Sequence, residues 1–222
     1  MSAESGIATF RDSDGLWAKY RIEDVCTPEA LARNRPMVID FYNIRRKELL
    51  EKEPNAGHKA IVELSDSGLY EVEVVTQNID DLHERAGSRK VTHLHGELRK
   101  LRSSMDENAT VPIEGWEQGP ESRHPDGSLL RPFVVFFGES VPMLETAIEI
   151  VQKADILIIV GTSLAVYPAA SLVHYVGPEV PIYLIDPVVP DTRSIRNKVI
   201  HIQAGASVGV PQVVKELMDA VD

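Results

Sequence analysis

The sequence is poor in cysteine, aromatic residues and positive charge. Its 222 residues include one cysteine, Cys26, which excludes an internal disulfide framework and a zinc site made of four cysteines. Aromatic residues make up only 6% of the chain, but 43% of its residues are apolar, which is enough to build an ordinary core. We interpret Cys26 as a small buried hydrophobe in a protein of a reducing compartment.

The scarcity of positive charge limits the kinds of partner that the protein can bind. Lys and Arg number 23 against 34 Asp and Glu, so the formal net charge is -11. Binding to nucleic-acid phosphates requires clustered Lys and Arg, and we therefore expect no direct nucleic-acid partner. The longest apolar runs, such as 156–160, are too short to span a bilayer, and no secretory signal pattern is visible. We expect no membrane association and a cytoplasmic location.

Short apolar segments that alternate with helical patterns predict the fold class. The strand candidates are 72–76, 91–94, 133–137, 156–160, 182–185 and 199–202. Several of them are nearly unbroken apolar runs, as is typical of strands covered on both faces. Helix candidates lie between them at 80–86, 142–153 and 168–175, and the last one lies at 211–221. This alternation predicts an α/β fold with a Rossmann-like, doubly wound parallel sheet.

Two stretches interrupt the alternation and predict a small inserted lobe of helices and loops. Residues 28–66 look purely helical, with Thr27 and Asn55 as candidate N-caps, while residues 97–132 are polar and rich in Gly, Pro and Ser. We expect one domain over 1–222. Its nucleotide lobe would comprise 1–27, 67–96 and 133–222, and its small lobe 28–66 and 97–132.

Polar side chains follow the predicted strands at their carboxyl ends. Residues 76–87 read TQNIDDLHERAG, residues 91–97 read VTHLHGE, and Gly161-Thr162-Ser163 follows the most apolar strand. Open α/β sheets bind ligands at this edge, because helix amino termini and loop amides converge there. The pattern predicts a nucleotide enzyme, and His95 before Gly96 is the candidate for its chemistry.

Together with the segments 2–11 and 161–170, these runs resemble the sirtuins, the NAD-dependent protein-lysine deacylases. The motifs occur in the family's order. The resemblance implies NAD as cofactor and acylated-lysine proteins or peptides as partners. In the implied reaction the acyl oxygen displaces nicotinamide, and His95, the general base, accepts a proton from a ribose hydroxyl. The acyl group then leaves as an ester on ADP-ribose. A near-neutral imidazole suits this step.

The resemblance also assigns residues to NAD. They are Ala3, Glu4, Phe10, Arg11, Trp17, Gln77, Asn78, Ile79, Asp80, Gly161, Thr162, Ser163, Asp186 and Ala206. Asp186 stands where many family members carry Asn. Taken without the resemblance, residues 77–80 would be a strand-to-helix turn capped by Asp80.

Tyr42 and Arg45 predict the acyl preference. Residues three apart on a helix share a face, and this pair resembles the one with which class III sirtuins bind the carboxylate of succinyl-lysine or malonyl-lysine. A charge-assisted hydrogen bond is worth about 1.5 to 3 kcal/mol, or roughly 10- to 100-fold over a neutral acetyl group. The alternative is a solvated basic face, since Arg46 and Lys47 follow. By the same resemblance, Phe137, Gly138, Val166 and Tyr167 would bind the substrate peptide as an added strand.

The chain departs from the family in two places. Most sirtuins carry four zinc-binding cysteines between the catalytic histidine and the Phe-Gly-Glu segment, and this chain has none there. We therefore expect no metal, and a loop that is either held by packing around Trp116 or mobile. The family also begins with a strand leading into Gly-Ala-Gly-x-Ser, and this chain begins at the x, so we expect the natural start to lie upstream.

Two other functions compete with a deacylase. One is an N-terminally truncated, inactive remnant that binds acyl-lysine. The other is an NAD-dependent oxidoreductase, which usually has a Gly-x-Gly-x-x-Gly turn that is absent here. The sequence leaves open the protein targets, the oligomeric state and the balance among succinyl, malonyl and acetyl substrates.

Overall fold

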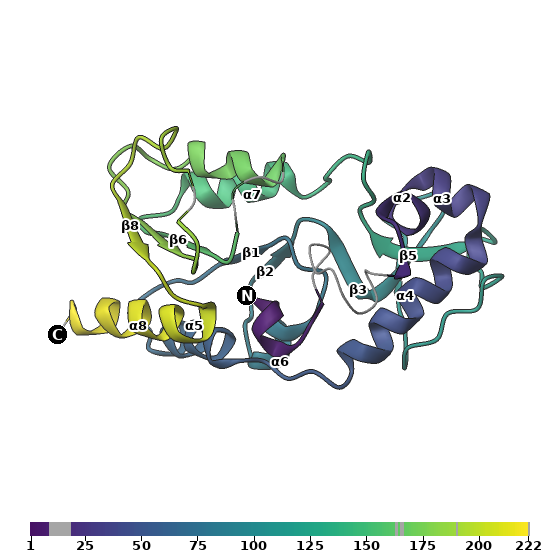
Figure 1. The fold of residues 1–222 in the computed structure, drawn as a ribbon, viewed down its shortest axis with the longest axis horizontal. Coiled ribbons are helices and arrows are strands. Elements are labelled where there is room, and N and C mark those ends of the chain that lie inside the picture. The colour runs from purple at the N-terminus through teal and green to yellow at the C-terminus, as the bar shows by residue number, and fades with distance from the viewer. Residues whose placement is uncertain (9–18, 163, 165–166, 190, 222) are drawn as a thin grey trace.

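The computed structural model describes residues 1–8, 19–162, 164, 167–189 and 191–221 (Figure 1). Strand β1 (Val74–Thr76) runs parallel to β2 (Val91–His93). Strands β6 (Leu157–Val160), β7 (Ile182–Ile185) and β8 (Val199–Ile202) form a second parallel sheet. Helices cover both faces of these strands, as the unbroken apolar sequences require. The predicted α/β fold class is confirmed.

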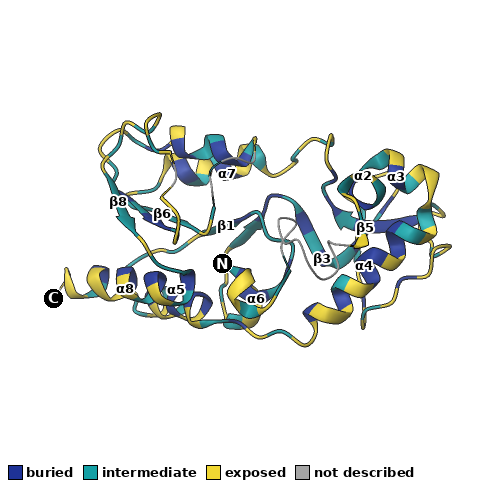
Figure 2. Cartoon of the chain, in the orientation of Figure 1, coloured by how far each residue is buried: buried dark blue, intermediate teal, exposed yellow. Residues whose placement is uncertain are grey.

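The main core surrounds the sheet β6–β7–β8. Helices α5 (Ala56–Asp66) and α8 (Ala206–Asp219) lie side by side on one face, where Val210 and Val213 pack with Ile185. Helix α7 (Leu144–Gln152) and the 3-10 helix η2 (Ala169–His174) cover the other face. Figure 2 shows each helix buried along one stripe and exposed along the opposite one. Full burial of each such apolar side chain contributes about 1.5 to 3 kcal/mol.

Two predicted helices differ from those observed. The segment 168–175 forms a 3-10 helix instead of an α-helix. Helix α8 begins at Ala206, not at Pro211, because the Glu4 carboxylate accepts hydrogen bonds from the backbone N–H groups of Ala206 and Ser207. This cap comes from the other end of the chain. The proline signal at 211 therefore misplaced the start of the helix.

The opposite end of the molecule holds helices α2 (Ile22–Val25), α3 (Pro28–Arg33) and α4 (Arg35–Leu49) (Figure 1). The predicted N-caps are confirmed. Thr27 Oγ1 accepts from Ala30 N at 3.1 Å to begin α3, and Asn55 forms a capping box that begins α5. The short helix α6 (Leu82–Ala86) ends at Gly87 in a left-handed conformation, also as predicted.

An antiparallel sheet packs against these helices. It consists of β3 (Gly96–Ser103), β4 (Thr110–Pro112) and β5 (Leu130–Val134). The irregular structure predicted for 97–132 is thus wrong in part, and the strand predicted at 133–137 pairs with β3 instead of joining the parallel sheet. A register shift between Gly96 and Leu101 breaks the alternation that would have revealed β3. Gly96 is required because a Cβ there would lie 2.2 Å from the Phe133 carbonyl oxygen.

The predicted division into two lobes needs one change. Residues 28–66 were grouped in the small lobe, but α5, their last part, packs against α8 and contributes Ala60 and Leu64 to the main core. The apolar stripe of α5 faces the nucleotide lobe, which a helical periodicity alone cannot reveal. On this packing the lobe boundary moves to about residue 55. The rest of the division stays a prediction.

The two parallel sheets are separated by a large cavity. In the described residues β1 pairs with β2 alone and β6 with β7 alone, so each has one open edge. The cavity has a volume of about 1330 Å³ and is lined by residues 72–80 along β1 and 156–162 along β6. Apolar residues of α8 and η2, among them Val214 and Val173, line it as well.

A buried arginine ties the small lobe together. Arg46 is 0% exposed and donates hydrogen bonds to the carbonyl oxygens of Leu98 at 3.0 Å and Trp116 at 2.8 Å, and to Asn43 Oδ1 at 2.6 Å. It also donates to Gln118 Oε1 at 3.3 Å. Burial lowers the pKa of its guanidinium to about 10, which still leaves it charged at neutral pH. The segment expected to pack around Trp116 is therefore held by hydrogen bonds from α4.

We predict that Arg46→Met lowers the free energy of unfolding by roughly 2 to 5 kcal/mol, because several buried acceptors lose their donor. Urea denaturation measures the change. Arg89→Met is the control, since the Arg89 side chain is 79% exposed and pairs with Asp66 at the surface. Equal stability losses in the two variants would contradict the role given to Arg46.

Candidate active site

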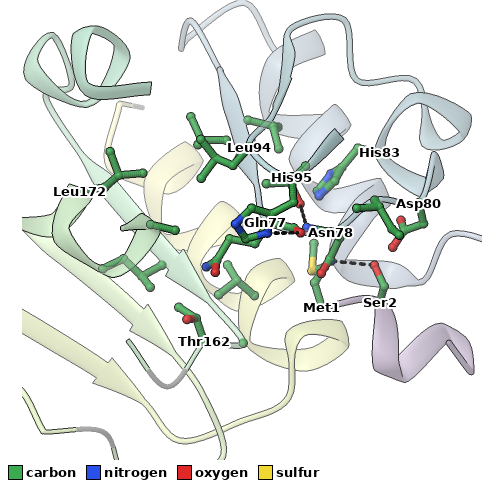
Figure 3. Close-up of a pocket in the computed structure, with 18 of the residues that line it drawn as sticks. Met1, Ser2, Gln77, Asn78, Asp80, His83, Leu94, His95, Thr162 and Leu172 are labelled. Carbon is green, nitrogen blue, oxygen red and sulfur yellow. Dashed lines mark hydrogen bonds between the residues drawn. The ribbon is translucent and has the colours of Figure 1, made fainter. Parts of the chain in front are cut away.

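The cavity between the sheets collects most of the predicted site residues (Figure 3). They come from the carboxyl ends of β1, β2 and β6, from α4 and from the turn that follows β5. The predicted residues that line it are Ala3, Tyr42, Arg45, Gln77, Asn78, Ile79, Asp80, His95, Phe137, Gly138, Gly161, Thr162 and Tyr167. The fold thus brings the predicted cofactor and substrate residues to one place.

Other predicted site residues lie elsewhere. Glu4 and Ala206 do not line this cavity and are joined to each other at the start of α8. Asp186 is also outside the cavity lining, and its Oδ1 accepts from Val188 N at 2.8 Å. Phe10, Arg11, Trp17, Ser163 and Val166 lie outside the described residues.

His95 is placed to act as a base. It follows β2, and its Nδ1 lies 3.0 Å from the backbone oxygen of Gln77. A carbonyl oxygen can only accept, so Nδ1 carries the proton and Nε2 is left with a free lone pair. Burial lowers the pKa of His95, and the hydrogen bond to Gln77 partly opposes that shift. The imidazole is therefore neutral near pH 7, as a proton acceptor must be.

The segment 77–80 is held from several sides. Asn78 N donates to Thr76 Oγ1 at 3.0 Å, and Asn78 Nδ2 donates to Ser2 Oγ at 2.9 Å, as Figure 3 shows. Asp80 is 5% exposed and accepts from Leu82 N at 3.2 Å, at the beginning of α6. Burial raises the pKa of Asp80 above its ordinary value. The side chains of Asn78 and Asp80 are thus both hydrogen-bonded at this strand end.

The opposite wall of the cavity allows a close backbone approach. Gly161 has a φ of 60°, and a Cβ there would lie 2.6 Å from the Met1 nitrogen, so only glycine fits. Thr162 follows it at the end of β6, across the cavity from Gln77 (Figure 3). Amide, carboxylate and hydroxyl groups of this kind suit a carboxamide and the hydroxyls of a ribose. The residues present fit NAD.

Sequence reasoning missed the part that two residues play in this cavity. Ser2 is buried at 4% exposure, and its hydroxyl binds Asn78, which is 76 positions away in the chain. Cys26 is 6% exposed, as its interpretation as a buried hydrophobe requires, but it also lines the cavity and accepts from the Tyr42 hydroxyl at 3.5 Å. Neither contact has a local sequence signal, because both join distant segments.

Among the described residues, no three His, Cys, Asp or Glu side chains gather in a way that could hold a metal ion. No helix in that part of the chain has the length and apolar character needed to cross a membrane.

Known proteins resemble this chain closely. The Sir2 family model matches residues 1–168. An NAD-dependent protein deacylase of Aggregatibacter actinomycetemcomitans is 57% identical over 187 residues, which cover 84% of this chain and 88% of the relative. Another, of Bacteroides thetaiotaomicron, is 51% identical over 226 residues and covers 99% of this chain and 95% of the relative.

Solved structures agree with these relatives. The crystal structure of a Sir2 homologue in complex with NAD matches with a TM-score of 0.86 at 38% identity, covering 100% of this chain and 87% of that one. The matches extend over the strand ends that carry Gln77, Asn78 and His95. The chain therefore belongs to the Sir2 family and is an NAD-dependent protein deacylase.

Proposed function

We propose that this enzyme removes succinyl and malonyl groups, and also acetyl groups, from protein lysines and transfers them to ADP-ribose. The observation that carries the proposal is the position of Tyr42 and Arg45. Both side chains come from one face of α4 and line the same cavity as His95. They offer a hydroxyl donor and a fixed positive charge to the far end of an acyl chain.

The surroundings of Tyr42 suit the recognition of a carboxylate. Its ring is 1% exposed and lies 5.1 Å from the Phe41 ring and 5.8 Å from the Phe136 ring, measured between centroids. Burial raises the pKa of its hydroxyl well above the ordinary value, so the group stays a donor at neutral pH. Arg45 is half-buried, and its guanidinium carbon lies 5.9 Å from the centre of the Phe41 ring. An acidic acyl group would meet the charge of Arg45 and would take the Tyr42 hydrogen bond from its weak sulfur acceptor, Cys26.

A turn beside the acyl pocket would hold the substrate peptide. Glu139 Oε2 accepts from Phe136 N at 2.7 Å, and Glu139 Oε1 pairs with Arg131 Nη1 at 2.6 Å. Phe137 N also donates to the Cys26 carbonyl at 2.9 Å. The side chains of Phe137 and Tyr167 are 52% and 69% exposed at the cavity. We place the peptide as an extended strand between these two residues.

The roles of the residues in the reaction follow from this placement. NAD, when bound, supplies the ribose that receives the acyl oxygen as nicotinamide leaves. Asn78 and Asp80 would hold ribose hydroxyls. The Gln77 carbonyl oxygen keeps the hydrogen of the His95 ring on Nδ1. His95 Nε2 would then take the proton from the ribose hydroxyl that becomes acylated. Addition of one water molecule and release of the lysine amine would complete the transfer to ADP-ribose. A solved Sir2 homologue, a mutant bound to 2′-O-acetyl ADP ribose, supports an ester of ADP-ribose as the product.

The first test is mass-spectrometric turnover of a succinyl-lysine peptide with NAD. We expect loss of the succinyl mass in the parent chain and a loss of rate of roughly 100-fold or more in His95→Ala, since a general base contributes about that much. Peptide binding without NAD binding would favour the acyl-lysine-binding remnant. Production of NADH would favour the oxidoreductase.

The pH dependence of kcat/KM tests the state of His95. The base must be unprotonated, so kcat/KM should fall as the pH decreases through the pKa of His95, which burial places below the ordinary value of 6.5. A midpoint at or above 6.5 for the acid limb would contradict the assignment.

Arg45→Met tests the acyl preference. Desuccinylation should fall by about 10- to 100-fold, while deacetylation should change by less than about threefold, because only the succinyl carboxylate uses the charge. Lys47→Met removes the same charge from an exposed position of α4 and is the matched control. Equal losses for both acyl groups in Arg45→Met would rule out the assigned role.

A further inference from the structure

The first histidine of the run His93-Leu94-His95 contacts the segment 77–80, which follows β1, from the side away from the cavity. It ends β2, is 8% exposed and does not line the cavity. Its Nδ1 lies 3.0 Å from the carbonyl oxygen of Asn78, and its Nε2 lies 2.8 Å from Glu84 Oε1 on α6. Both ring nitrogens are thus engaged, one by the loop after β1 and one by a helix.

The chemistry of the two partners determines the charge of His93. A backbone carbonyl and a carboxylate both accept hydrogen bonds and donate none, so each ring nitrogen must carry a hydrogen. His93 is then an imidazolium ion. Burial opposes this charge, but the hydrogen bond and negative charge of Glu84 outweigh it and raise the pKa of His93. The pKa of Glu84 is correspondingly lowered, although burial alone would raise it.

The other charged and titratable groups around His93 fit this assignment. Glu97 on β3 and Asp80 in the loop after β1 are acids, and both favour the positive ring. His83 on α6 opposes it only when charged, and burial lowers the pKa of His83 to about 4, so it is neutral at pH 7. Glu84 is the one acid of this group within hydrogen-bond distance of the ring.

The hydrogen bond between His93 and the Asn78 carbonyl holds a segment that is assigned to NAD binding. Asn78 is held through its N–H by Thr76, through its side chain by Ser2 and through its carbonyl by His93. Gln77, the residue before it, holds His95 through its own carbonyl. Rotation of the peptide after Asn78 would change the direction of Ile79 and Asp80. The His93 contact therefore fixes the peptide after Asn78, and the next carbonyl, that of Ile79, accepts from Leu98 N at 2.7 Å.

We propose that His93 is a positioning residue: as an imidazolium held by Glu84, it fixes the Asn78 carbonyl and with it the segment 77–80 that binds NAD. The inference rests on the assignment of Gln77, Asn78 and Asp80 to the cofactor. It adds a condition: only the charged ring can donate to Glu84 and to Asn78 at once, and a neutral ring would keep its one hydrogen on Nε2, toward the stronger acceptor Glu84. NAD affinity should therefore fall as the pH rises through the pKa of His93.

The direct test is the charge state of the ring, read from ¹⁵N chemical shifts of labelled protein without NAD. We expect His93 to be doubly protonated and His95 to be neutral at pH 7. Glu84→Gln should move the titration of His93 to lower pH, whereas Glu63→Gln, which removes the same charge from an exposed position of α5, should not. A neutral His93 ring at pH 7 in the parent protein would overturn the proposal.

NAD binding measured by calorimetry gives the second readout. His93→Asn should weaken NAD binding by about tenfold, with KM for NAD raised to match and kcat changed by less than about threefold. In Glu84→Gln the side-chain amide can donate to Nε2 while a neutral ring keeps its hydrogen on Nδ1 for Asn78, so NAD affinity should fall less with rising pH than in the parent. A purely structural role would lower the unfolding temperature without this difference in pH dependence. Parental affinity in His93→Asn would refute the positioning role, whereas no NAD binding by the parent would instead contradict the assignment of the cofactor site.

Discussion

The site depends on hydrogen bonds made by the first five residues. The short 3-10 turn Ser2–Ser5 is bound at once by three distant elements. Asn55, the cap of α5, donates to the Met1 carbonyl at 3.2 Å and to Ser5 Oγ at 3.0 Å. Asn78 donates to Ser2, and Glu4 caps α8. If this turn moved, the loop after β1 and the amino end of α8 would both lose partners that no neighbouring group in the chain supplies.

The two histidines at the end of β2 differ in charge because their hydrogen-bond partners differ. His93 and His95 are two residues apart, and both are largely buried. One meets a carboxylate and a carbonyl, and the other meets a carbonyl alone. The first environment stabilises a cation and the second a neutral base, so residues of one type receive different tasks.

Two buried arginines hold the loops of the small lobe, where most family members use a zinc ion. The described residues of this lobe contain no thiolate cluster. Arg46 binds carbonyl and amide oxygens of the 113–118 segment, and Arg131 pairs with Glu139 while lying over the Phe136 ring at 4.0 Å. The planar guanidinium makes several directed bonds at once, which suits it to joining segments that are remote in sequence.

The sequence by itself determined the local features of this protein. It was enough to predict the apolar strands β6 to β8, the caps Thr27 and Asn55, the end of α6 at Gly87, and the polar strand ends that carry Gln77 and His95. Each of these depends on residues a few positions apart, where periodicity, caps and turn residues act directly. The family resemblance followed from the same short segments.

Only the tertiary structure decided the rest, because the deciding contacts join residues far apart in the chain. Glu4 sets the start of α8 across 202 positions, and the Phe133 carbonyl explains Gly96. Helix α5 belongs to the main core because α8 buries its apolar stripe. The charge of His93 depends on Glu84 and on the backbone of Asn78, and a backbone carbonyl is present at every position of a sequence. The direction in which the Asn78 carbonyl points is set only when the chain has folded.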